Sequence, residues 1–168
     1  MNTNTKPDTE TALEPDLDIV RTLAPGDLDK VVAIDAAAAG RRRPLYFQLM
    51  FERAIKQTSL QVSLAAELDG RVVGFLIASL YYGEFGVSEP AASLEAIGVE
   101  AAYRGRRVGH ALMRQLRLNL AALGVRTLRT EVSWDNFDLL AFFSQEGFRP
   151  ASRLCLERSL DATAPDPT

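Results

Sequence analysis

The chain has 168 residues, 47% hydrophobic and 24% charged, which suits one folded domain and excludes a fibrous, repetitive or wholly disordered protein. A formal net charge of -3 argues against a general nucleic-acid binder, whose phosphate contacts need a basic surplus. The single cysteine, Cys155, and the single histidine, His110, exclude an internal disulfide and the usual Cys/His zinc sites, so no metal is expected.

The two ends of the chain differ from its middle. Residues 1–17 and 161–168 mix polar residues and proline without hydrophobic periodicity, which predicts disordered tails around a domain of residues 18–160. The first residues lack the basic and apolar regions of a secretory signal, and no apolar run reaches the about 20 residues that span a bilayer. We therefore expect a cytoplasmic protein without a membrane partner.

A short strand and two helices are predicted first. Residues 19–23 have the composition of a strand, and Asp27 stands where it can cap a helix that ends at Gly40. Pro44 is expected at the first position of a second helix. Its apolar residues recur at spacings of three and four: Phe47, Met50, Phe51, Ala54 and Ile55.

Three strands come next. Residues 60–68 and 71–82 are rich in β-branched and aromatic residues, and Asp69-Gly70 between them is a two-residue hairpin signal. A connection over residues 83–93 leads to another strand at 94–99.

The last third alternates helix and strand. An apolar stripe predicts a helix that Gly124 ends, and it consists of Val108, Leu112, Leu116, Leu120 and Leu123. We predict a strand at 127–132, a short helix at 138–145 and a final strand at 153–159. The order β-α-α-β-β-β-α-β-α-β is that of an α/β domain around a mixed sheet.

The segment from Val99 to Gly109 carries the chemistry. A buried strand runs into a glycine-bearing turn and then into an amphipathic helix, so unpaired N–H groups and the positive end of the helix dipole meet at one point. Such a point binds phosphate, and the arginines of the turn favour it. Neither the glycine-rich motif of the Rossmann fold nor that of the P-loop occurs in the chain. The alternative is an ordinary turn with solvated arginines.

This segment resembles the Arg/Gln-x-x-Gly-x-Gly/Ala signature of the GCN5-related N-acetyltransferase (GNAT) family. Arg104 and Gly109 match the two ends of the signature, and Arg107 stands at its first glycine. Val99 and Tyr103 have the Val-x-x-x-Tyr spacing that precedes it. Farther along, the spacing of the family's second cofactor segment is matched by Asn136, Ala141 and Gly147-Phe148. The resemblance covers residues 18–160 and is strongest over 94–148.

The resemblance implies a mixed, mostly antiparallel GNAT-type sheet flanked by helices. It implies acetyl-CoA as the acyl-donor substrate and direct transfer to a primary amine in a ternary complex. The pantetheine arm would lie between strands that separate at 97–99 and 130–132. The cofactor-binding residues expected on this basis are Ile97, Gly98, Val99, Arg104, Gly105, Arg106, Arg107, Val108, Gly109, His110, Asn136 and Phe143. Two alternatives stay open. Arg106 and Arg107 either reach the adenosine phosphate or face water, and Asn136 is either a pantetheine contact or a helix cap or turn residue.

A base must take a proton from the acceptor ammonium, and Glu95 is the candidate catalytic residue. Relatives in the family often carry an acidic residue at this point, four residues before Val99. The alternative is a carboxylate paired with an arginine at the sheet surface. Glu84 and Glu131 are lesser candidates, and three acids near one site would favour a cationic acceptor. His110 suits the role poorly because it lies at the helix N-terminus beside the phosphates.

Phe143 stands where many relatives of that family place a tyrosine that protonates the leaving thiolate. A phenylalanine cannot donate that proton, so Ser144, water, Tyr81 or Tyr82 would replace it, or the thiolate would leave unassisted. The same residue supports a rival reading, a CoA-binding module without turnover. Transfer of a longer acyl group, such as succinyl, is a further alternative.

Acceptor specificity is expected from residues 27–57 and 83–93. The expected acceptor is a small-molecule amine or a protein amine. Members of the family often form homodimers, so the resemblance implies a homodimer here. Cys155 is expected to be buried, and three aromatic residues are expected in the core or against the cofactor: Trp134, Phe137 and Phe142.

Overall fold

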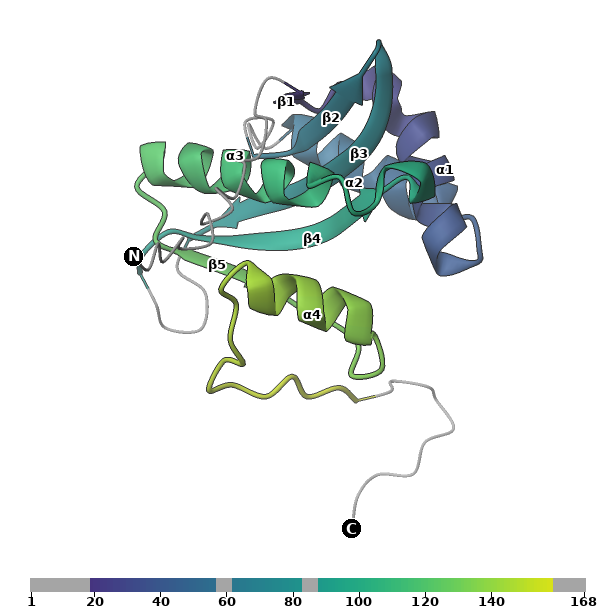
Figure 1. Cartoon of the computed structure of the whole chain (residues 1–168). Helices are drawn as coiled ribbons and strands as arrows, with labels where there is room; N and C mark the ends of the chain where they lie inside the picture. Colours follow the sequence, from purple (N-terminus) through teal and green to yellow (C-terminus); the bar gives the residue numbers. More distant parts are fainter. Residues whose placement is uncertain (1–18, 57–61, 83–87, 159–168) are drawn as a thin grey trace, which may run out of the picture. The chain divides into compact units, whose positions relative to one another are not determined.

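The computed structural model describes residues 19–56, 62–82 and 88–158, so both predicted tails lie outside the described residues. The chain forms two compact units that divide between Glu131 and Val132. The first holds β1 (Val20–Thr22), η1 (Pro25–Asp27), α1 (Leu28–Ala39), α2 (Pro44–Lys56), β2 (Leu64–Leu68), β3 (Arg71–Tyr81), β4 (Ala91–Val99), η4 (Ala101–Tyr103), α3 (Val108–Ala122) and β5 (Thr127–Thr130) (Figure 1). The second holds α4 (Phe137–Gln145).

The first unit is built on one sheet with the strand order β1-β2-β3-β4-β5. Neighbouring strands are antiparallel except β4 and β5, which are parallel, so the predicted mixed, mostly antiparallel sheet is confirmed. The β2–β3 hairpin turns at Asp69 and Gly70, whose φ angles of 49° and 72° lie in the left-handed region that a type I′ turn requires.

Helices cover both faces of this sheet. A Cβ at Gly74 of β3 would lie 2.9 Å from Val108 Cγ1 of α3, so the absent side chain lets α3 approach the sheet closely. On the opposite face, Phe75 of β3 meets the ring of Phe47 from α2 edge-on at 5.7 Å between centroids. Figure 1 shows α3 across the near face, with α1 and α2 on the other side.

The predicted apolar stripe of α3 is largely buried. Val108, Leu112, Leu116 and Leu120 are inside, whereas Leu123 is 43% exposed because the helix ends at Ala122. Gly124 follows with a φ of 71°, the left-handed conformation expected just beyond a helix C-terminus. The helix that follows β4 is therefore packed into the protein along most of its length.

Gly98 of β4 is required by packing. A Cβ there would fall 2.6 Å from Cε1 of Phe75 and 3.2 Å from Cγ2 of Ile34. We expect Gly98→Ala to lower the free energy of unfolding by about 1–3 kcal/mol, as overpacking of a filled core does. Urea denaturation measures it, with Gly26→Ala as control because a Cβ at Gly26 meets nothing within 4 Å. Equal losses in the two variants would contradict the packing argument.

Asp27 precedes α1 as predicted, but its carboxylate does not cap that helix. Its Oδ2 accepts a hydrogen bond from the Ala24 amide at 2.7 Å, and Arg21 donates to both of its oxygens at 2.8 and 2.9 Å. Burial by itself would raise the pKa of Asp27, but the hydrogen bonds from Arg21 and Ala24 outweigh it, so the pKa lies below its ordinary value.

This lowered pKa predicts acid sensitivity. Because Asp27 binds its proton less tightly in the folded chain, it adds stability above pH ~4, the pKa of an unfolded aspartate, and loses it as pH falls through the folded value. Asp27→Asn should therefore unfold at lower urea than the wild type at pH 7, with a difference that shrinks between pH 5 and pH 3. A difference independent of pH would show that the carboxylate's charge contributes nothing.

In the second unit, α4 begins at Phe137, one residue before the predicted start. Asn136 caps it, since its Oδ1 accepts a hydrogen bond from the Leu139 amide at 3.2 Å. The Phe143 ring is buried and lies 5.4 Å from the ring centroid of Phe142 and 5.0 Å from that of Phe148.

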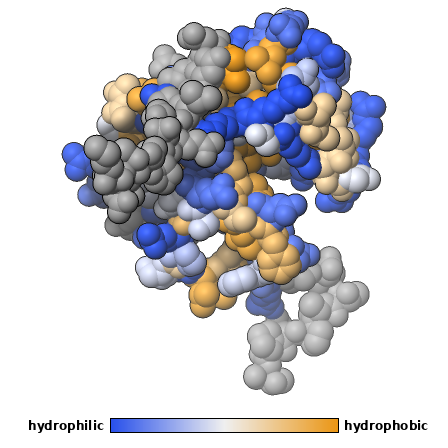
Figure 2. Space-filling view, in the orientation of Figure 1, coloured by the Kyte–Doolittle hydropathy of each residue, from blue (hydrophilic) through white to orange (hydrophobic). Residues whose placement is uncertain are grey.

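The predicted final strand is wrong over residues 153–158, which form neither helix nor strand. Alternating Leu154 and Leu156 supply a strand pattern, but a strand also needs a hydrogen-bonded neighbour, and no ladder in the described part of the chain includes this segment. Cys155 is exposed, not buried. Trp134 and Phe137 are 92% and 74% exposed, so neither lies in the core, whereas their packing against the cofactor stays a prediction. Figure 2 shows orange, hydrophobic surface in the region of α4.

Across the ranges 19–56, 62–82 and 88–158, no helix has both the length and the apolar character needed to cross a membrane.

Candidate functional site

The outer edge of β4, the edge on the side of β5, is hydrogen-bonded to β5 over only the first half of the strand. β5 pairs with β4 from Ala91↔Thr127 to Leu94↔Thr130, where Thr130 Oγ1 also donates to Leu94 O at 3.0 Å. β4 continues to Val99, held on its other side by β3 up to the Gly74↔Val99 pair. Among the described residues, no strand pairs with the outer edge of β4 over residues 95–99. An extended ligand could therefore hydrogen-bond there as an added strand would.

Glu95 lies where this separation begins. The β3–β4 register pairs Ile77 with Ala96 but Ala78 with Leu94, so Glu95 is the extra residue of a β-bulge. Bulges bend a strand and redirect a side chain, and they often occur beside active sites. The predicted base thus lies at the fork between β4 and β5, by which we mean the point after Leu94 and Thr130 where the two strands stop pairing.

The Glu95 carboxylate is paired with Arg53 of α2, whose Nη2 donates to Glu95 Oε2. The Glu95 side chain is 18% exposed and that of Arg53 is 49% exposed, so solvent reaches both partners. The arginine-paired carboxylate left open by the sequence is therefore present, at the fork. Arg53 was missed because it is 42 residues from Glu95 and nothing local marks it.

The turn after β4 prepares the N-terminus of α3. Gly105 and Arg107 have φ angles of 74° and 61°, both left-handed, and Val108 begins the helix. The first i→i−4 hydrogen bond is donated by the Ala111 amide to Arg107 O at 3.0 Å. The amides of Val108 and Gly109 come before that bond, so the helix ladder does not use them, and they suit an anion.

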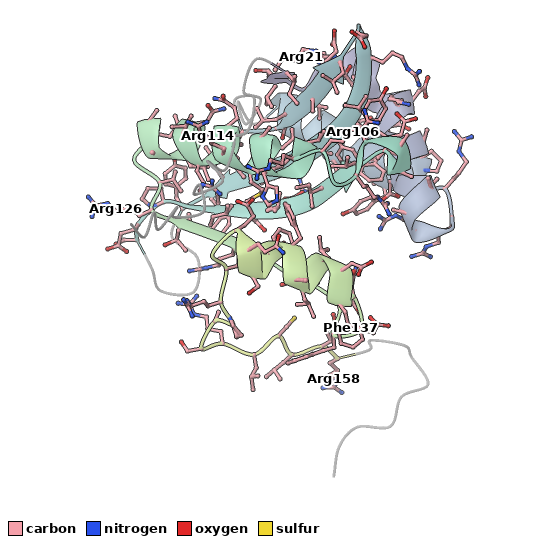
Figure 3. All side chains as sticks on the ribbon, in the orientation of Figure 1. Arg21, Arg106, Arg114, Arg126, Phe137 and Arg158 are labelled. Carbon is pink, nitrogen blue, oxygen red and sulfur yellow. The ribbon has the colours of Figure 1, made fainter. Side chains whose placement is uncertain are left out.

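Side chains of the turn contact the protein itself, as Arg104 and Arg106 show. Arg104 Nε donates to the carbonyl oxygen of Val99 at 3.3 Å and so links the end of β4 to the turn. The guanidinium of Arg106, labelled in Figure 3, lies 5.4 Å from the ring centroid of Tyr103. Arg104, Arg106 and Arg107 are all exposed, which leaves the phosphate-binding and solvated readings open.

Arg107 occupies a left-handed position that costs a residue with a side chain about 1 kcal/mol. We expect Arg107→Gly to be more stable than Arg107→Ala by about that amount, because both variants lose the side chain and only glycine is relaxed at this φ. Urea denaturation of the two variants measures it. Equal stability would contradict a left-handed conformation at this residue.

The remaining predicted residues are divided between the units. His110 is half-buried in the first turn of α3. Glu131 follows β5 and is exposed, whereas Glu84 lies outside the described residues. Asn136 and Phe143 belong to the second unit. In the described parts of the chain, no group of three or more His, Cys, Asp or Glu residues is placed to hold a metal ion.

A model of the acetyltransferase (GNAT) family matches residues 30–148, most of the chain. The chain therefore belongs to the acetyltransferase (GNAT) family. The match includes β4, the turn after it, α3 and α4, so the resemblance predicted from the sequence is confirmed.

One individual relative matches part of the chain at moderate sequence identity. L-2,4-diaminobutyric acid acetyltransferase from Nocardia farcinica is 33% identical over 100 residues, which are 60% of this chain and 50% of that protein. The chain thus spans about half the length of this curated relative.

Solved structures share the fold. Aminoglycoside antibiotic 6'-N-acetyltransferase AAC(6')-Ih from Acinetobacter baumannii has a TM-score of 0.69 at 21% identity, with 83% of this chain and 96% of that chain covered. Aminoglycoside N-acetyltransferase AAC(6')-Iy in complex with CoA has a TM-score of 0.67 at 22% identity, with 84% and 93% covered.

Proposed function

We propose that this protein is an acetyl-CoA-dependent N-acetyltransferase that transfers the acetyl group directly to a small primary amine in a ternary complex. One observation carries the proposal: the β4 edge at 95–99, without a strand partner among the described residues, leads through a tight turn into a helix N-terminus with unused amides. Membership of the acetyltransferase (GNAT) family and the CoA bound to AAC(6')-Iy support the choice of donor.

Donor binding would use backbone more than side chains. The pantetheine amides would pair with the outer edge of β4 at Ile97, Gly98 and Val99, and the pyrophosphate would lie against the amides of Val108 and Gly109. The rest of the turn and the third residue of α3 would border the phosphates: Arg104, Gly105, Arg106, Arg107 and His110. Asn136 and Phe143 of the second unit are proposed as further donor contacts.

The transfer step needs a neutral amine beside the thioester. Glu95 would accept a proton from the acceptor ammonium through a water molecule. The freed nitrogen lone pair then attacks the thioester carbon and a C–N bond forms. The C–S bond breaks to release CoA thiolate, and the nitrogen loses its second proton to water, which leaves the neutral amide. Holding the two reactants side by side supplies much of the rate, because positioning replaces a bimolecular encounter.

The leaving thiolate receives no proton from Phe143, which has no hydroxyl and packs between Phe142 and Phe148. A thiol with a pKa near ~8.5 leaves readily as the thiolate, so water can protonate it afterwards. The same observation favours the second candidate function, a CoA-binding module without turnover.

Thiol release separates the two candidates. Purified protein is incubated with acetyl-CoA and a panel of amines that includes 2,4-diaminobutyrate, aminoglycosides and a peptide N-terminus. Free thiol is read with a chromogenic disulfide and the acetylated product by mass spectrometry. Acceptor-dependent thiol release supports the transferase, whereas tight CoA binding with no product from any amine supports the module. A succinyl-CoA arm tests the longer acyl group, and sedimentation tests the predicted homodimer.

A further inference from the structure

The ion pair at the fork uses less of the guanidinium than the pairs that Arg21 and Arg43 make with carboxylates. Arg43 donates through both Nε and Nη2 to the two oxygens of Asp35, and its guanidinium lies 4.8 Å from the ring centroid of Tyr46. Arg53 donates through Nη2 alone, to Oε2 of Glu95. Within the described residues, neither Arg53 nor Glu95 has another charged partner.

The unused donors suit a carboxylate. A guanidinium binds a carboxylate best through two parallel N–H···O bonds, and the single contact with Glu95 leaves donors of Arg53 for such a bidentate pair. The Arg53 side chain is 49% exposed, so a small ligand can reach it from solvent. Oε1 of Glu95 is likewise outside the contact with Arg53 and can accept from an ammonium or a water.

The charge balance at the fork argues against a purely cationic acceptor. A cationic acceptor would be favoured by three acids at one site, but Arg53 neutralises the candidate base Glu95. Of the two lesser candidates, Glu131 is exposed and Glu84 lies outside the described residues. A polycation entering this place would meet the guanidinium as well as the carboxylate. A molecule with one positive and one negative group would replace one ion pair with two.

We propose that Arg53 and Glu95 select a zwitterionic acceptor, an amino acid whose carboxylate binds Arg53 while its reacting ammonium faces Glu95. This inference rests on the proposed N-acetyltransferase function and deepens it. Arg53 becomes a specificity-determining residue, and Glu95 keeps the role of taking the proton that the ammonium loses before its nitrogen attacks the thioester.

Matched acceptors that differ only in the carboxylate test the proposal. The pairs are 2,4-diaminobutyrate against 1,3-diaminopropane, ornithine against 1,4-diaminobutane, and lysine against 1,5-diaminopentane. In at least one pair, the wild type should show at least about 10-fold higher kcat/KM for the amino acid, the effect of one added charge-assisted interaction. Equal values in all pairs, or preference for the diamines, would overturn the proposal.

Variants of Arg53 separate selection from stability. Arg53→Gln should raise KM for the amino acid at least about 10-fold while the diamine keeps or gains activity, because Glu95 is no longer occupied; Arg53→Lys should restore part of the loss. Arg126→Gln removes an exposed arginine just before β5, outside the residues expected to contact either substrate, and should leave both acceptors unchanged. Equal loss on amino acid and diamine in Arg53→Gln would mean a merely structural role.

A binding measurement keeps this test independent of turnover. The same acceptor pairs are titrated calorimetrically into the full chain saturated with CoA. Tighter binding of the amino acids, lost in Arg53→Gln, supports the zwitterion site even if no amine is acetylated, in which case only the proposed transferase activity fails. Equal or absent binding of both members of every pair overturns the site.

Discussion

Glu95→Gln is expected to lower kcat/KM for acetyl transfer by about 10²–10⁴-fold, the usual contribution of a positioned general base. Glutamine has nearly the same shape and can still accept a hydrogen bond from Arg53, but it cannot take a proton from the acceptor ammonium. The pH dependence of kcat/KM should change with it. Steady-state rates measured between pH 5 and pH 9 with the best acceptor of the panel provide the test.

Two controls show whether the loss is chemical. CoA affinity and the urea midpoint of Glu95→Gln should stay close to the wild type, because the partner Arg53 remains half exposed to solvent. Glu131→Gln, which alters the exposed acid after β5, should keep its rate. If Glu131→Gln is the slower variant, or if the pH profile of Glu95→Gln matches the wild type, Glu95 is not the base.

Features with local signals could be predicted from the sequence. The β2–β3 hairpin depends on two adjacent residues, Asp69 and Gly70, that accept left-handed backbone, and α3 depends on apolar residues three and four positions apart. Pro44 at the start of α2 is equally local. The turn from Val99 to Gly109 belongs to the same class, because its strand, turn and helix are consecutive.

The arrangement at the fork could not be predicted from the sequence, because it depends on how distant segments pack in the folded chain. A bulge at Glu95 follows from the register of β3 against β4, which neither strand encodes alone. The contact with Arg53 needs α2 packed against the sheet, 42 residues from Glu95. Asp27 shows the same limit: it stands before α1 as predicted, but Arg21 and the Ala24 amide draw its carboxylate away from the helix. Tertiary partners decided each of these side chains.

The strand predicted over residues 153–158 is wrong because a local pattern was present but, within the described part of the chain, a partner strand was not. Alternation of Leu154 and Leu156 satisfies the local requirement of a strand, yet pairing is a property of two segments. In the described residues this segment stays exposed and without a ladder.

A carboxylate placed at the start of α3 should abolish tight donor binding. Gly109 is the second residue of α3, and its amide precedes the first helical hydrogen bond. Gly109→Glu should raise the Kd for CoA on the order of 100-fold relative to Gly109→Gln, because a negative charge within a few ångströms of the phosphates costs about 3 kcal/mol in a partly screened site. Calorimetric titration of CoA into both variants measures the ratio.

The stability of the same two variants gives the independent control. An acidic side chain in the first turn interacts favourably with the helix dipole, so Gly109→Glu should unfold at the same or higher urea than Gly109→Gln. Weaker CoA binding in a variant that is no less stable can only come from charge at the binding point. If the two variants bind CoA equally, the phosphates do not lie at the N-terminus of α3, and the arginines of the turn would then be surface residues.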